Sequence, residues 1–131
     1  MKFNIVTNYE TPPLEDHENL QLGELDTIPD SSCVSAILDG TFNYMTDDQI
    51  ESLCLKIRHG GIISISSPDV LEISGALYHG RINLASFSDL TSQRLRQHSL
   101  MDAINIFQSR GYTIETASIK DFHFLLKVKR P

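Results

Sequence analysis

Short apolar runs alternate with amphipathic stretches along the chain. The runs at residues 3–7, 33–38 and 62–65 predict β-strands, because each is compact and lies near turn-forming residues. The continuous apolar run at 62–65 is typical of an interior parallel strand that is covered on both faces. A further short extended segment, which stops near Pro29, is indicated by three leucines, Leu20, Leu22 and Leu25.

Apolar residues at helical spacing follow Thr46, which suits an N-cap because the next two residues are acidic. The positions i, i+3, i+4 and i+7 of this stretch are apolar and give one buried face: Ile50, Leu53, Cys54 and Ile57. Gly60 is expected to end the helix in a left-handed conformation, with His59 in its last turn.

The second half of the chain contains further helical patterns. Residues 68–78 predict a helix that begins at Pro68, since proline suits the first helical position. Residues 84–95 are less periodic and predict at most a short helix. Residues 99–110 give the clearest pattern, with Ser99 as the N-cap.

Two β-rich runs at 113–118 and 123–128 predict an antiparallel hairpin, joined by a short turn at Lys120-Asp121. Strands that alternate with helices indicate an α/β protein. We therefore expect a sheet of about five strands, flanked by helices and extended by the C-terminal hairpin. The length of 131 residues predicts a single domain, 1–131.

The formal net charge is −6, from 11 basic and 17 acidic residues. Net acidity disfavours nonspecific binding to nucleic acid, although it leaves room for a local basic patch. No apolar run reaches the roughly 18 residues of a membrane span, and the N-terminus does not have the pattern of a secretory signal. These features predict a cytoplasmic protein. Cys33 and Cys54 lack the spacing of metal ligands and are expected to be buried free thiols.

Several motifs occur in an order that resembles class I S-adenosylmethionine (SAM) methyltransferases. The segment GELDTIPDSSCVSAIL is similar to the acidic turn and fourth strand of that family. LKIRHGGIISIS resembles the helix end, Gly-Gly turn and fifth strand, and SRGYTIETASIKDFHFLLKVKR resembles the final pair of strands. The chain is also similar to short methyltransferase-like proteins carried by tailed bacteriophages. The resemblance implies a minimal Rossmann-like sheet with SAM as a candidate cofactor.

The resemblance also implies where a site would lie, because ligands of open α/β sheets bind beyond the carboxyl ends of the strands. The implied cofactor-binding residues are Thr7, Asn8, Asp26, Asp39 and Gly40. The candidate substrate-binding residues are Asn43, Tyr44, Tyr78 and Arg81. Alternatively, the residues that follow Asp39 form a turn with packing side chains, and Tyr78 lies at a solvated helix end. No residue pattern assigns a catalytic group or a metal site.

One part of the family pattern is missing. Where the family has a glycine-rich cofactor loop, residues 7–13 read TNYETPP, without glycine and with two prolines that lack a backbone N–H. The leading interpretation is therefore a methyltransferase-like protein without independent catalysis, which serves as a binding or accessory subunit. The alternative is an active SAM-dependent methyltransferase of a small-molecule or carbohydrate acceptor. A third hypothesis is a homo-oligomer, or a complex with a protein partner, formed through exposed sheet edges.

Overall fold

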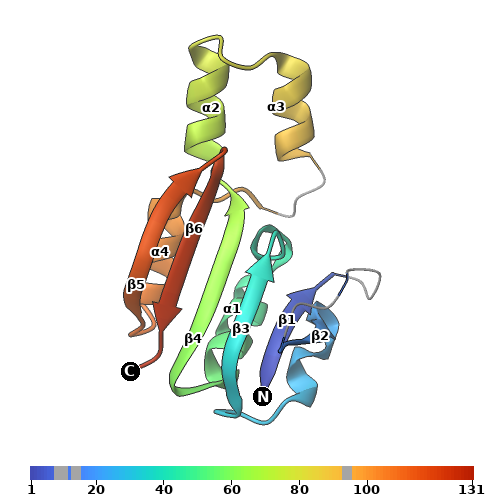
Figure 1. Cartoon of the computed structure of the whole chain (residues 1–131), viewed down its shortest axis with the longest axis vertical. Helices are drawn as coiled ribbons and strands as arrows, with labels where there is room; N and C mark the ends of the chain where they lie inside the picture. Colours follow the sequence, from blue (N-terminus) through green and yellow to red (C-terminus); the bar gives the residue numbers. More distant parts are fainter. Residues whose placement is uncertain (8–11, 13–15, 93–95) are drawn as a thin grey trace.

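A six-stranded mixed sheet organises the chain, with strand order β2-β1-β3-β4-β6-β5 (Figure 1). The computed structural model describes residues 1–7, 12, 16–92 and 96–131. The strands are β1 Lys2–Val6, β2 Glu18–Gln21, β3 Cys33–Asp39, β4 Ile57–Pro68, β5 Thr113–Lys120 and β6 His123–Lys129. The first four strands of the sheet are parallel, and β6 is antiparallel to both β4 and β5. This confirms the α/β class and the C-terminal hairpin.

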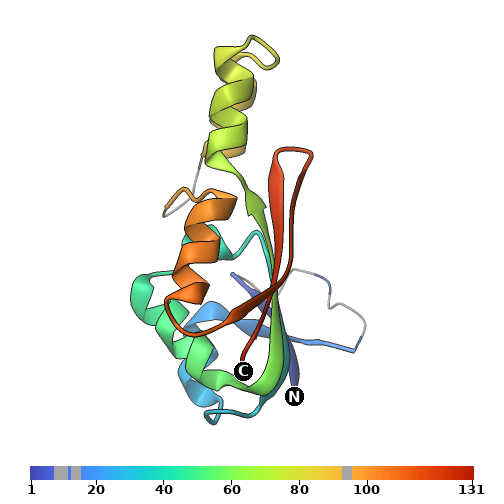
Figure 2. The same cartoon turned by 90° about the vertical axis from the view of Figure 1, so that its left-hand side faces the viewer.

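The helices cover one side of the sheet (Figure 2). The 3-10 helix η1 and helices α1 and α4 lie on that side, whereas α2 and α3 project as an arm beyond the end of β4 (Figures 1 and 2). The bounds are η1 Leu22–Thr27, η2 Phe42–Tyr44, α1 Asp47–Lys56, α2 Val70–Tyr78, α3 Leu84–Thr91 and α4 Leu100–Gln108. No helix of the described residues is long and apolar enough to cross a bilayer.

The two predicted N-caps are confirmed. The Thr46 hydroxyl accepts a hydrogen bond from Gln49 N at 3.2 Å, and the Gln49 side chain accepts one from Thr46 N at 2.9 Å, which forms a capping box. Ser99 accepts a hydrogen bond from Asp102 N at 3.2 Å. These caps satisfy backbone donors at the first turns of α1 and α4, so both helices begin where the sequence indicates.

The core lies between the sheet and the helices α1 and α4. Alternate residues of each strand point to this side, and the central ones are Ile5, Ala36, Leu38, Ile63, Ile65, Phe124, Leu126 and Val128. The remaining alternate residues point to the opposite side, which we call the open face. Its residues are Lys2, Asn4, Val6, Asn19, Gln21, Ser35, Ile37, Asp39, Ile62, Ser64, Ser66, Thr116, Ser118, Lys120, His123, Leu125, Lys127 and Lys129.

The expectation that β4 is covered on both faces is wrong for the described part of the chain. Ile62, Ser64 and Ser66 point to the open face and are only partly buried, because no described helix lies over them (Figure 2). The alternation of isoleucine with serine from Ile63 to Ser66 matches a strand with one covered face.

The predicted end of α1 is also wrong. The helix ends at Lys56, and β4 already begins at Ile57, so His59 lies in the strand. Gly60 does have a left-handed φ of 81°, but it donates to the carbonyl of Arg130 at 2.7 Å instead of capping a helix. Pairing with the C-terminal residues therefore makes this segment part of a strand rather than the end of a helix.

Three smaller boundaries differ from the sequence prediction. Leu22 and Leu25 belong to η1 rather than to an extended segment, because Leu25 is buried in the core. Pro68 ends β4, and Asp69 is the N-cap of α2. The hairpin turn falls at Asp121-Phe122, and both residues have positive φ, at 52° and 66°. This is the backbone that suits the right-handed twist of a two-residue hairpin.

Gly61 is expected to tolerate no side chain. A Cβ there would lie 2.7 Å from Ile57 Cγ2, 2.9 Å from Arg58 O and 3.0 Å from Cys33 O. We expect Gly61→Ala to lower the free energy of unfolding by about 1–3 kcal/mol, because two of the three contacts are to backbone. Gly23→Ala is the matched control, since nothing lies within 4 Å of its added Cβ. Equal urea midpoints for the two variants would contradict this packing.

Candidate functional site

The carboxyl ends of β1, β3 and β4 meet at one edge of the sheet. Gly40, with φ of 75°, lets the chain leave β3, and its N–H donates to Ser66 O at 2.7 Å. The buried hydroxyl of Thr41 donates to Ile5 O at 2.7 Å. The turn after β3 is therefore fastened to both neighbouring strands, which is the place where open α/β sheets bind ligands.

Phe42 occupies the centre of this edge. Its ring is fully buried and lies 4.5 Å from the ring of His98, 5.8 Å from that of Phe107 and 6.3 Å from that of Phe124. Phe124 pairs with Ser67 across β4 and β6. We call Phe42, Asn43, Ser67 and His98 the edge cluster, because they come from three segments and gather at this end of the core.

The edge cluster contains buried polar atoms that have no hydrogen-bond partner within the described part of the chain. They are both amide atoms of Asn43, the Ser67 hydroxyl and Nε2 of His98, and these side chains are 0%, 0% and 4% exposed. Buried polar groups are normally paired with protein or with ordered water. The cluster is therefore where this molecule can accept an internal water or a polar ligand group.

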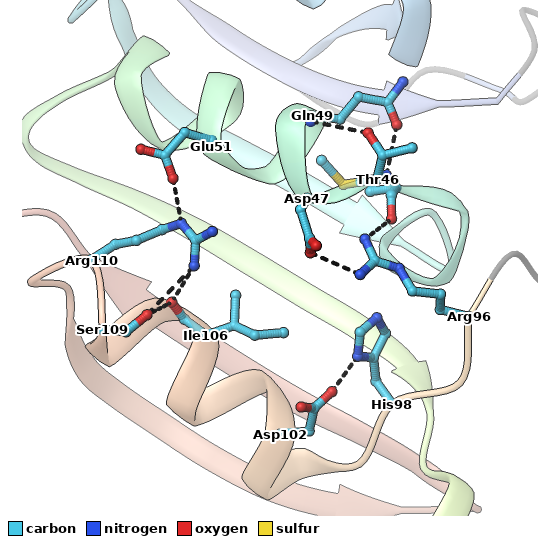
Figure 3. Close-up of polar contacts among 11 residues, drawn as sticks. Thr46, Asp47, Gln49, Glu51, Arg96, His98, Asp102, Ile106, Ser109 and Arg110 are labelled. Atoms are coloured by element: carbon cyan, nitrogen blue, oxygen red, sulfur yellow. Dashed lines mark hydrogen bonds and ion pairs between the residues drawn. The ribbon is translucent and has the colours of Figure 1, made fainter.

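Asp102 orients the imidazole ring of His98. Nδ1 of His98 contacts Oδ2 of Asp102 in the first turn of α4 (Figure 3). When the neutral imidazole donates its Nδ1 proton to this carboxylate, Nε2 carries a lone pair and is an acceptor. His98 was not among the candidates from the sequence; the i, i+4 spacing of His98 and Asp102 at a helix start was the available signal.

Arg96 clamps the segment before α4 to the segment after η2 (Figure 3). The Arg96 guanidinium donates to Asp47 Oδ1 at 2.8 Å and to Met45 O at 2.7 Å. The backbone N–H of Arg96 donates to Asn43 O at 2.9 Å. The Arg96 hydrogen bond holds the pKa of Asp47 below its usual range. A second pair, Arg110 Nε with Glu51 Oε2 at 2.9 Å, joins α4's end to α1.

The cofactor-binding candidates divide between the two sides of the sheet. Thr7 is exposed just beyond β1, and Asn8 lies outside the described residues. Asp39 is exposed on the open face, next to Gly40. Asp26 lies in η1 on the helix-covered side, where its Oδ1 accepts from Ser52 Oγ at 3.0 Å. Asp39 and Gly40 are thus together, and Asp26 is apart from them.

The substrate-binding candidates are likewise divided. Asn43 is buried in η2 and Tyr44 beside it is half-buried, so both belong to the sheet edge. Tyr78 is 85% exposed at the end of α2. Arg81 lies just beyond it and forms a 3.9 Å ion pair with Glu72. The nine residues of α2 separate this pair from the edge by about 13 Å.

A shallow depression of about 400 Å³ lies on the open face. Its lining includes Ile37, Asp39, Ser66, Thr116, Leu125 and Lys127. Of the predicted cofactor-binding residues that the structure describes, Asp39 lines this depression. The remaining lining is apolar or hydroxyl-bearing, with one lysine.

Both cysteines are free and buried, as the sequence predicts. Burial raises the pKa of the Cys54 thiol from 9.0 to about 11, and burial also raises the pKa of Cys33. A protonated thiol is a weak nucleophile, so neither residue suits nucleophilic catalysis at neutral pH.

Cys54 is expected to make the fold sensitive to alkali. Since its folded-state pKa is raised, its contribution to stability is complete below pH 9 and is lost as the pH rises toward 11. At about 1.4 kcal/mol per pH unit this loss is at most about 3 kcal/mol. Urea unfolding at several pH values should show a shallower decline for Cys54→Ala than for the wild type. Equal slopes would contradict the assignment.

The fold matches those of solved SAM-dependent methyltransferases. A SAM-dependent methyltransferase from Methanosarcina mazei matches with a TM-score of 0.65 and 10% identity, over 98% of this chain and 82% of that one. One from Mesorhizobium loti matches with a TM-score of 0.64 and 13% identity, over 96% and 78% of the two chains.

A Haloferax volcanii protein assigned as a methyltransferase, in complex with the methyltransferase activator Trm112, matches with a TM-score of 0.59 and 12% identity. This match covers 92% of the present chain and 64% of that protein. No family model matches the chain, and no curated protein matches it by sequence. At these identities the likeness establishes a Rossmann-like, methyltransferase-type fold, and function has to be argued from the site.

Proposed function

We propose that this protein is a cytoplasmic binding or accessory subunit built on a methyltransferase-like fold, and that it does not transfer methyl groups by itself. The observation that carries the proposal is the glycine-free segment that follows β1, residues 7–13. Nucleotide-type cofactors on such sheets are held by backbone N–H groups that glycines allow to approach closely. Pro12 and Pro13 supply no N–H and restrict the backbone.

The second strand adds support. β2 comprises four residues and ends at Gln21, where the family resemblance calls for a carboxylate that binds the cofactor ribose. An amide can bind a hydroxyl group, but it lacks the charge that makes such a hydrogen bond strong. Two interactions expected to bind the cofactor are therefore weakened: the backbone N–H groups that follow β1 and the ribose contact at the end of β2.

Isothermal titration with SAM and with S-adenosylhomocysteine tests the proposal. We expect no binding up to millimolar concentration, with the protein folded throughout as judged by circular dichroism. Binding in the micromolar range would contradict the proposal, and methyl transfer by the purified protein to any acceptor would do so as well.

The second candidate is an active SAM-dependent methyltransferase of a small-molecule or carbohydrate acceptor. It is favoured by Asp39, which precedes Gly40 and lines the depression of the open face, and by Nε2 of His98, which is buried at the same end of the sheet with no hydrogen-bond partner among the described residues. Methyl transfer depends chiefly on proximity and orientation, so it requires few diagnostic residues. Under this alternative, Asp39→Ala should weaken SAM binding without unfolding the protein.

A protein partner fits the accessory role. The Haloferax volcanii protein with a similar fold binds an activator protein, and the outer strands of this sheet, β2 and β5, are candidate edges for pairing with another chain. A homo-oligomer through the same edges is the competing arrangement. Light scattering that finds a monomer at micromolar concentration would exclude the homo-oligomer.

A further inference from the structure

The charges of this molecule are unevenly distributed. Four of the chain's five lysines lie on the open face, namely Lys2, Lys120, Lys127 and Lys129. The exposed carboxylates of η1 and α1 lie on the opposite side and include Asp26, Asp47, Asp48 and Glu51. On that side Arg96 and Arg110 pair with Asp47 and Glu51, and the open face also carries the exposed carboxylate of Asp39. With four lysines and one carboxylate the open face is still net positive, although the chain has a net charge of −6.

Three apolar side chains of the open face lie among serines on the neighbouring strands β3, β4 and β6. Ile37 and Ile62 are half-buried, Leu125 is 40% exposed, and Ile37 and Leu125 line the depression of about 400 Å³. Lys127 and Asp39 also line it. Exposed apolar side chains next to charged ones are common at protein-binding surfaces.

The open face is also large enough for a partner. Asn4 and Val6 of β1 are buried, so the accessible part of the face comprises the strands β3, β4, β6 and β5. Four strands spaced by about 4.8 Å, with about six residues each at roughly 3.3 Å, give about 15 by 20 Å, which accommodates one helix of about 10–12 Å diameter. Parallel strands are, moreover, normally covered on both faces, usually by helices.

We propose that the open face binds an amphipathic helix with acidic flanks, supplied by a partner protein. The apolar side of such a helix would cover Ile37, Ile62 and Leu125, which lie on the three neighbouring strands β3, β4 and β6, and its carboxylates complement the lysines. A single-stranded nucleic acid would need aromatic side chains for base stacking, and the open face as defined here carries no Phe, Tyr or Trp. The proposal rests on the binding role proposed above, and it names the surface and the chemistry of the partner.

A display library of random peptides of about 16 residues, which as helices span about 24 Å, provides an unbiased probe. We expect enriched peptides to be acidic and amphipathic, to become helical on binding, and to bind with affinities that fall as salt rises. Fluorescence anisotropy of a labelled enriched peptide then gives Kd for the wild type and the variants.

Two variants and one matched control locate the binding surface. Leu125→Asp removes the apolar contact and Lys127→Glu reverses an exposed charge, and each should weaken binding at least tenfold. Arg81→Glu changes the net charge by the same amount at the tip of the α2–α3 arm, and it should alter Kd by less than twofold. Lys127 is exposed, so that variant keeps the test valid even if Leu125→Asp fails to fold.

Four results would overturn the proposal. They are a lack of enriched peptides, enrichment of peptides without acidic residues, an affinity unaffected by Lys127→Glu, and displacement of the peptide by an oligonucleotide at lower concentration. A dimer in light scattering that Lys127→Glu dissociates would assign the face to a second copy instead. The SAM titration tests the proposed function separately from the peptide experiment. Cofactor binding would contradict the proposal that the protein lacks a SAM site, and it would leave the docking surface unaffected.

Discussion

Phe42→Ala should destabilise the protein by about 3–5 kcal/mol, the usual cost of removing a buried aromatic ring. The ring is fully buried and contacts the rings of His98, Phe107 and Phe124. Its loss therefore leaves a cavity where the turn after β3 meets α4 and β6, and the surrounding side chains can close it only in part. Urea unfolding followed by circular dichroism measures the change.

The matched control for Phe42 is Tyr78→Ala. Tyr78 is an aromatic residue that is 85% exposed, so its truncation should change stability by less than about 0.5 kcal/mol. If Phe42→Ala lowered the free energy of unfolding as little as Tyr78→Ala, Phe42 would not be part of the packed core.

Asp69→Ala should cost about 2–4 kcal/mol, because one carboxylate caps two helices and each cap contributes about 1–2 kcal/mol. Oδ1 of Asp69 accepts from Glu72 N at 3.0 Å in α2, and Oδ2 accepts from Leu100 N at 2.8 Å in α4. Since Asp69 is 2% exposed, water cannot readily replace it, and the freed N–H groups would stay unpaired.

Asn83→Ala is the control for Asp69→Ala. Asn83 caps α3 alone, through a 2.8 Å hydrogen bond from Ser86 N, and it is exposed, so its loss should cost about 1 kcal/mol or less. Thermal unfolding compares the two variants directly. If they had equal effects, the second hydrogen bond of Asp69, to α4, would contribute nothing, and the arm would not be coupled to the sheet through this carboxylate.

Local signals in the sequence predicted local structure well. Thr46 and Ser99 were identifiable as N-caps because the cap and its partner lie three residues apart. The end of α1 was not identifiable in the same way. Gly60 has the left-handed backbone that the sequence suggested, but its hydrogen bond goes to Arg130, and a contact across 70 residues leaves no local trace.

The place of Asp39 and Gly40 in the fold was predictable, whereas their role in a binding site stays a prediction. Asp39 and Gly40 do lie at the carboxyl end of β3, as the resemblance implied. The edge cluster was missed because Asn43, Ser67 and His98 come from three separate segments, and none of them stands out among its sequence neighbours. The open face had a visible signal, since serine alternates with isoleucine along β4, but the apolar character of the run was given more weight than its alternation.

The opposed charges of the two sides of the sheet have a consequence for how this molecule behaves as an electrostatic body. Four lysines outnumber Asp39 on the open face, and on the other side Arg96 and Arg110 offset Asp47 and Glu51 among the exposed carboxylates of η1 and α1. We therefore expect a modest dipole moment directed across the thickness of the sheet. A dipole of this kind turns an approaching molecule before contact, at distances up to the Debye length of about 8–10 Å at physiological salt. The protein, despite a pI of about 5.2, should therefore meet anionic and cationic surfaces with opposite sides, so that its orientation on each is determined before any hydrogen bond forms.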